Sequence, residues 1–165
     1  MKKFMFIITT VLFMTFSGNV VAQDTVVDIA VGNEDFSTLV TALKAADLVG
    51  ALNSEGPFTV FAPTNTAFAD LLLELDPSGN TALGDLDPAL VDAVLLQHIV
   101  AANVQSSELP NGTVTTLGGP ITADNTAFTL TDANDRVCGI VTSLVDIQAA
   151  NGVVHVLDKV ILPLL

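Results

Sequence analysis

His98 and His155 are the two histidines of the chain, and histidine is the side chain best suited to proton transfer near neutral pH. Neither has a partner at a catalytic spacing: the sequence contains no Gly-x-Ser-x-Gly elbow, no His-Glu-x-x-His pair, no Gly-x-Gly-x-x-Gly fingerprint and no Walker loop. His98 follows Val94 by four residues on the apolar face of a predicted helix, and His155 lies between two valines in a predicted strand. We therefore expect both imidazoles in the core, hydrogen-bonded to backbone, and no catalytic residues.

The carboxylates could in principle supply an acid and a base for glycoside hydrolysis. The chain has 18 Asp and Glu residues but no Trp and no Tyr, the aromatic platforms that sugar-processing clefts commonly present. A hydrolase is therefore the weakest of the functions that we consider.

One acidic segment resembles a calcium-binding loop in its spacing. Asp76, Ser78, Asn80 and Asp87 place side-chain oxygens at positions 1, 3, 5 and 12. The turn glycine of such a loop is replaced by Thr81, and its last ligand is Asp where Glu is usual. We interpret the segment as an acidic loop between two helices and predict no metal and no cofactor.

Three amphipathic helices are predicted to position these side chains. Apolar residues recur at helical spacing over 36–46, 65–75 and 88–98, and Asp35 and Asp87 are placed to cap the first and the third. A short buried strand is expected over 58–61, and strand-like runs separated by turn signals follow from residue 104 onward. Helices first and strands later predict an α+β domain.

Several residues are predicted to serve the architecture. Pro63, Thr64 and Asn65 are expected to form the corner between strand and helix, with turn and cap roles, and Asn151-Gly152 is typical of a tight turn with positive φ. Cys138, the single cysteine, lies among strand-like neighbours. A buried, inert thiol is favoured there over a reactive or intermolecular one.

Four segments carry a family resemblance. They are the runs from Phe58 to Phe68, from Leu95 to Val100, from Asp146 to Gly152 and from Asn151 to Pro163. In this order they resemble the signature segments of the fasciclin-like domain, and the similarity extends from about residue 36 to residue 163. It implies a β-sandwich or wedge with several helices packed at its side, acting as a non-enzymatic extracellular adhesion or binding module.

Asp146 and Ile147 are the candidate binding residues that this resemblance implies. Some adhesive fasciclin-like domains carry an Asp-Ile pair at this place, linked to receptor contact, and a carboxylate beside an apolar side chain can offer both kinds of contact. The same pair could instead end a strand, with Ile147 in the core and Asp146 capping a turn. Gln97 stands before His98 where the family has Tyr, so no role of that tyrosine is carried over.

Residues 1–22 are typical of a secretory signal peptide: Lys2 and Lys3 precede an apolar run, and Val20-Val-Ala22 suits cleavage before Gln23. A membrane anchor is the alternative, but the run is shorter than the ~20 residues that span a bilayer. We expect residues 23–165 to form a single domain that is secreted or periplasmic, and the short leader indicates a bacterial origin.

The mature chain would be strongly acidic. Its basic residues are Lys44, Arg136 and Lys159 against 18 acidic ones, a net charge of −15. Nucleic acid and anionic membranes are thereby excluded as partners, since both need Lys and Arg to neutralise phosphates. The acidity suits either solubility or divalent-cation bridging to an anionic surface.

Two functions remain in view. The first is adhesion or matrix association through contacts with an extracellular protein or polysaccharide, and the second is a small-molecule or lipid carrier with an apolar pocket between sheet and helices. The sequence leaves open the partner, any calcium requirement and the oligomeric state.

Overall fold

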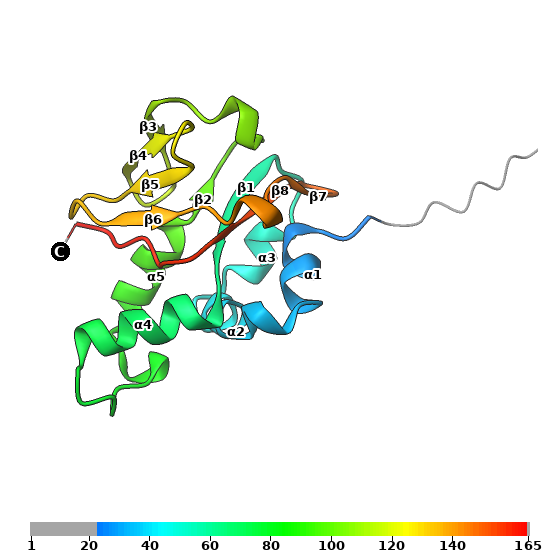
Figure 1. Cartoon of the computed structure of the whole chain (residues 1–165). Helices are drawn as coiled ribbons and strands as arrows, with labels where there is room; N and C mark the ends of the chain where they lie inside the picture. Colours follow the sequence, from blue (N-terminus) through cyan, green and yellow to red (C-terminus); the bar gives the residue numbers. More distant parts are fainter. Residues whose placement is uncertain (1–22, 165) are drawn as a thin grey trace, which may run out of the picture.

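The computed structural model describes residues 23–164, which form two four-stranded sheets with helices packed against one of them (Figure 1). The predicted signal peptide lies outside the described residues. The first sheet has the order β2-β1-β8-β7, and its strands are β1 (Phe58–Pro63), β2 (Ile99–Val100), β7 (Ile147–Ala149) and β8 (Gly152–Leu157). The second is an antiparallel meander of β3 (Gly112–Thr115), β4 (Pro120–Asp124), β5 (Thr129–Thr131) and β6 (Val137–Gly139).

The helices come mostly before the second sheet in the chain. They are α1 (Val26–Val31), α2 (Ser37–Ala45), α3 (Val49–Leu52), α4 (Asn65–Leu75) and α5 (Pro88–Gln97), with 3-10 turns η1 (Glu34–Phe36), η2 (Leu83–Asp85), η3 (Ser106–Glu108) and η4 (Thr142–Leu144). The α+β class predicted from the sequence is confirmed, and so is the placement of helices at the side of paired sheets.

A parallel pair of strands forms the centre of the first sheet. β1 and β8 pair in register from Phe58 opposite Gly152 to Pro63 opposite Leu157. A Cβ atom on Gly152 would lie 1.9 Å from the carbonyl oxygen of Phe58, so close backbone approach is what demands glycine there. The sequence-based prediction of positive φ at Asn151-Gly152 is wrong: neither residue has it, and the tight turn between β7 and β8 consists of Ala150 and Asn151.

Alternation along the central strands divides the core in two. Val60 and Ala62 of β1 face the helices, whereas Phe61 faces the second sheet. On β8, Val154 and Val156 likewise belong to the helical core. The central strands are therefore buried on both faces, which explains why β8 is apolar throughout except for its histidine.

Local capping explains where the helices begin. Thr64 caps α4 by accepting a hydrogen bond from the N–H of Ala67 at 3.3 Å, and Asp87 caps α5 with Pro88 in its first turn. Asp35 does not cap α2. Asn33 accepts a hydrogen bond from the N–H of Asp35 at 3.0 Å, so a 3-10 turn starts earlier and α2 follows it without a side-chain cap.

Asn65 and Asn151 join segments far apart in the chain. The amide of Asn65 accepts from the N–H of Thr38 at 2.9 Å and donates to the carbonyl of Glu34 at 2.8 Å, which fixes the start of α4 against the start of α2. Asn151 accepts from the N–H of Val26 at 3.0 Å, and its Nδ2 donates to the carbonyls of Leu52, the last residue of α3, and of Ser54. Pro63 is the buried last residue of β1.

His98 ends α5 in the core between the two sheets and the helices. Its Nδ1 lies 2.7 Å from the carbonyl oxygen of Val94, and its Nε2 accepts a hydrogen bond from the N–H of Ile161 at 3.0 Å. Because burial disfavours the imidazolium, it lowers the pKa of His98 to about 4 despite the bond to Val94. A neutral imidazole thus ties the end of α5 to the C-terminal segment.

Cys138 is fully buried on β6 within the core beneath the second sheet. Its thiol lies 3.7 Å from the carbonyl oxygen of Val160, and burial raises its pKa to about 11.

Over residues 23–164, no helix combines the length and the apolar character that crossing a bilayer requires.

Candidate functional site

Asp146 lies directly before β7 in a left-handed conformation, with φ of 56°. Its carboxylate accepts two hydrogen bonds from Ser106, one from the backbone N–H at 2.6 Å and one from the hydroxyl. Partial burial works to raise the pKa of Asp146, but the two bonds from Ser106 outweigh it and hold the pKa below its usual value. Asp146 is therefore an ionised anchor for η3, and it keeps part of its surface in solvent.

Ile147 begins β7 and pairs with Val154 of β8. Its side chain is half-buried and packs against the core that faces the helices. The structure thus places both predicted binding residues at one end of the first sheet, with Asp146 turned to Ser106 and Ile147 turned inward. Gln148, the residue after Ile147, has an exposed side chain.

His155 lies beneath Asp146 and is fully buried. Its Nε2 lies 2.8 Å from the carbonyl oxygen of Val104, and its Nδ1 accepts a hydrogen bond from the N–H of Asp146 at 3.2 Å. Since Nδ1 accepts, Nε2 is the nitrogen that donates to Val104. The ring also stacks on Phe61 with the centroids 5.6 Å apart.

A serine, a histidine and an aspartate thus meet here, yet they are not connected as a catalytic triad. The hydroxyl of Ser106 donates to Asp146 and not to the imidazole of His155, and both ring nitrogens of His155 are occupied by backbone groups. A triad needs the imidazole between serine and aspartate, free to take the serine proton. Asp146 and His155 instead bind backbone groups and hold the segment around Val104 and Ser106 in place.

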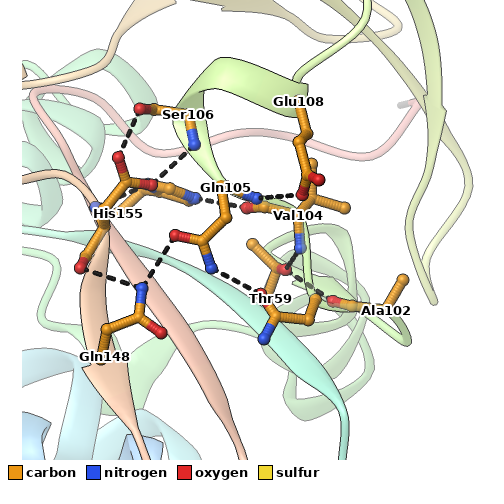
Figure 2. A network of polar contacts seen from close by, with 10 residues as sticks. Thr59, Ala102, Val104, Gln105, Ser106, Glu108, Gln148 and His155 are labelled. Atoms are coloured by element: carbon orange, nitrogen blue, oxygen red, sulfur yellow. Dashed lines mark hydrogen bonds and ion pairs between the residues drawn. The ribbon is translucent and has the colours of Figure 1, made fainter.

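Thr59 of β1 anchors the same region from below. Its buried hydroxyl donates to the carbonyl of Ala102 at 2.6 Å and accepts from the N–H of Val104 at 2.8 Å. Thr59 and His155, on neighbouring strands, therefore clamp the segment 101–108 onto the first sheet (Figure 2). This segment connects β2 to β3.

A chain of side-chain amides runs along the outer edge of this network. Gln148 Nε2 donates to Gln105 Oε1 at 2.8 Å (Figure 2). Gln105 Nε2 in turn donates to Asn103 Oδ1 at 2.8 Å. Within residues 23–164, Asn103 Nδ2 and Gln148 Oε1 have no protein partner. The chain of amides therefore has a free donor at Asn103 and a free acceptor at Gln148. Sequence reasoning missed these residues, because no local pattern connects positions 43 residues apart.

A polar hollow of about 500 Å³ adjoins the amide chain at Asn103. Its walls come from the start of α1, the loop between α3 and β1, and the turn between β7 and β8. The lining carries amide, hydroxyl and carboxylate groups, among them Thr25, Asn53, Ser54, Glu55, Asn103 and Asn151. We name the amide chain and this hollow together the polar surface.

The acidic loop with calcium-like spacing has a different use in the structure. The Asp76 carboxylate accepts hydrogen bonds from Ser78, Asn80 and Thr81, and these bonds, those of Ser78 foremost, lower its pKa to about 2. The oxygens that a cation would need are thus engaged with the loop itself. In the described part of the chain, His, Cys, Asp and Glu side chains form no group of three suited to a metal ion.

An apolar pocket of the kind that a carrier needs lies between α2, α4, α5 and η2. It is lined by aliphatic and aromatic side chains, including Phe68, Leu71, Leu90 and Leu162. Its volume is about 20 Å³, and a cavity of this size holds about one water molecule. The pocket is closed to a lipid or a drug-sized ligand in this conformation.

Comparison with known proteins bears on the same segments. The sequence model of the fasciclin domain matches residues 34–163. The protein sll1483 of Synechocystis is 44% identical over 142 residues, covering 84% of this chain and 73% of that protein. The cell surface glycolipoprotein MPB83 of Mycobacterium bovis is 34% identical over 152 residues, covering 86% of this chain and 62% of that protein.

The fold itself has a counterpart among solved structures. The FAS1 domain pair from the insect cell adhesion molecule fasciclin I aligns with a TM-score of 0.66 at 18% identity, covering 86% of this chain. This chain spans about half (52%) of that structure. The shared arrangement of sheets and helices, together with the matched residues 34–163, shows that this chain belongs to the fasciclin domain family.

Proposed function

We propose that this protein is a non-enzymatic extracellular binding module that attaches to a matrix component, a protein or a polysaccharide, through the polar surface. The observation that carries the proposal is the amide chain from Gln148 through Gln105 to Asn103, which ends in a free donor and a free acceptor beside an open hollow. Hydroxyl and peptide groups each need both a donor and an acceptor. The surface therefore suits sugars and polypeptide backbones alike.

The network beneath the amides supports this function by holding them in place. Asp146, Ser106, His155 and Thr59 fix the segment 101–108 through hydrogen bonds whose partners are buried or half-buried. A pre-positioned donor and acceptor lose little conformational entropy on binding. In this proposal Asp146 and Ile147 act as the support of the contact surface, and the exposed side chains of Gln148 and Asn103 form the contact.

The same geometry supports the non-enzymatic part of the proposal. Ser106 and His155 are both engaged in bonds that exclude proton transfer between them. An extracellular location is part of the proposal and rests on the leader-like residues 1–22 and on a relative that is named as a cell surface protein. The carrier function receives less support, because the apolar pocket holds only about 20 Å³.

The test is retention of the purified protein on matrix extracted from its own organism, separated into polysaccharide and protein fractions. We expect saturable retention that falls about tenfold in an Asn103→Ala/Gln148→Ala variant, because two neutral hydrogen bonds are removed. An Asn80→Ala variant serves as the matched control, since Asn80 is an exposed amide on the distant loop after α4. Absence of retention on every fraction, or equal retention of the double variant, contradicts the proposal.

A further inference from the structure

A groove is lined by residues of α2 and α5, two helices that lie away from β7 (Figure 1). It has a volume of about 180 Å³ and runs between α2 and the segment that carries η2 and the start of α5. The wall contributed by α2 and its C-cap contains Thr41 and three alanines, Ala42, Ala45 and Ala46, which share one side of the helix. Leu86 and Val91 form the opposite wall and are half-buried.

The size of the groove suits one apolar side chain. An engineered protein cavity of about 150 Å³ accepts benzene, so a space of 180 Å³ fits a leucine or phenylalanine side chain. The alanine methyls leave this depth because larger side chains on α2 would fill it. Leu86 and Val91 also line the closed apolar pocket below, so the groove floor is continuous with the core.

The segments that form this groove are rich in carboxylates. Asp92 lines the groove, Asp85 and Asp87 flank Leu86 in sequence, and Asp47 follows α2; all four are exposed. Two of them are fixed in position, because Asp85 accepts a hydrogen bond from the N–H of Ala82 and Asp87 accepts one from the N–H of Ala89, each at 2.9 Å. In the sequence ranges 41–47 and 83–92, Lys44 is the only basic residue.

The charges select among possible occupants. A second copy of this chain would bring the same carboxylates opposite one another, and like charges across an interface disfavour association. Anionic lipids and nucleic acids are repelled for the same reason. A basic polypeptide fits both the apolar groove and the carboxylates near it. One of its apolar side chains can fill the groove while neighbouring Lys or Arg residues pair with the carboxylates.

We infer that this groove receives an apolar side chain of a basic partner polypeptide, with cationic residues on either side of that anchor. The inference does not depend on the polar surface. It gives the protein a second contact on a separate face, and a module with two contacts can connect two components where one contact can only attach to one.

The test is a titration of the isotope-labelled protein, followed by NMR, with two capped peptides. One is Lys-Lys-Gly-Leu-Gly-Lys-Lys, and the other has Ser in place of Leu. We expect the leucine peptide to bind at least about tenfold more tightly, since burying a leucine contributes that much or more, and to shift the amides of Ala42, Ala45 and Val91. Raising the salt from about 50 to about 500 mM should weaken binding, because it screens the carboxylates.

Two matched variants locate the contact. Ala45→Arg fills the groove from an exposed position on α2, and Ala69→Arg adds the same charge on the solvent face of α4, away from the groove. We expect Ala45→Arg to weaken binding of the leucine peptide at least tenfold and Ala69→Arg to change it less than about twofold. Equal affinity for the two peptides, or native affinity in Ala45→Arg, overturns the inference.

The Asn103→Ala/Gln148→Ala variant separates this inference from the proposed function. Because its changes lie at the polar surface, it should bind the leucine peptide as the native protein does. Loss of matrix retention with peptide binding intact supports two independent contacts. Loss of peptide binding in this variant contradicts the groove as a separate site.

Discussion

The backbone N–H of Asp146 donates a hydrogen bond to Nδ1 of His155 at 3.2 Å, and this bond holds residue 146 in a left-handed conformation at the start of β7. The carboxylate of the same residue holds Ser106. One residue thus joins β8 to the segment that carries the exposed amides. Its backbone and its side chain have separate roles, which substitutions can distinguish.

Replacing Asp146 by Ala is expected to destabilise the protein more than replacing it by Gly. Both changes remove the bonds to Ser106. Ala is also strained in the left-handed region, because its Cβ atom crowds a backbone carbonyl, at a cost of about 1–2 kcal/mol. We expect the Gly variant to be more stable by about 1 kcal/mol in urea unfolding, after its greater entropy in the unfolded state is included. A more stable Ala variant would show that φ is relaxed at this position.

The buried imidazole of His98 predicts a pH dependence of stability above the range where most carboxylates titrate. Its pKa in the folded protein is about 4, below its usual 6.5, so the unfolded chain binds a proton first as the pH falls. The free energy of unfolding should therefore decrease from pH 6.5 toward pH 4, by up to about 1.4 kcal/mol per pH unit from this group. Above pH 6.5 the group has no effect.

A His98→Gln variant provides the control for this pH dependence. Its absolute stability will differ, but its slope between pH 6.5 and pH 4 should be flatter than that of the native protein, as measured by urea unfolding at several pH values. Identical slopes would mean that His98 titrates alike in the folded and unfolded states.

Replacing Asn151 by Ala should cost about 3 kcal/mol in the free energy of unfolding. The change removes three hydrogen bonds, from the N–H of Val26 and to the carbonyls of Leu52 and Ser54, at about 1 kcal/mol each. Asn53→Ala is the matched comparison, because the side chain of Asn53 accepts one exposed bond from Thr25 and should cost less than about 1 kcal/mol. Similar losses in the two variants would contradict the cross-linking role of Asn151.

The thiol of Cys138 is expected to report on unfolding. Burial and its raised pKa, about 11, leave almost no accessible thiolate in the folded protein at pH 8. A thiol-specific chromogenic disulfide should therefore react slowly with the native protein and rapidly in urea, with a rate that follows the unfolded fraction measured by circular dichroism. Rapid labelling of the folded protein would place Cys138 at an accessible position.

Local patterns predicted α2, α4 and α5, whereas the short helices α1 and α3 were missed. Asp87 with Pro88, and Thr64 before Asn65, act within a few residues of one another, and the starts of α4 and α5 depend on little else. The cap at Asp35 was wrong because Asn33 caps an earlier 3-10 turn that contains Asp35, and the N–H of Thr38, which such a cap could bind, donates to the distant Asn65. The positive φ expected at Gly152 was wrong. Glycine is needed there because the backbone of the distant strand β1 lies too close for a Cβ atom.

The candidate site could be predicted only in part. The family resemblance pointed to Asp146 and Ile147, which lie at the edge of the polar surface. The partners of Asp146 could not be found in this way, since Ser106 is 40 residues away and carries no motif. The exposed donor and acceptor at Asn103 and Gln148 depend on pairing between segments that meet only in the folded chain.

The parallel pairing of β1 with β8 has a consequence for biosynthesis. β1 is complete at residue 63, but its parallel partner β8 begins at residue 152, so one edge of β1 stays unpaired in a nascent chain until β8 has been made. Contacts this distant in sequence form slowly, and unpaired strand edges invite association with other chains. The domain should therefore depend on chaperones until β8 has been synthesised.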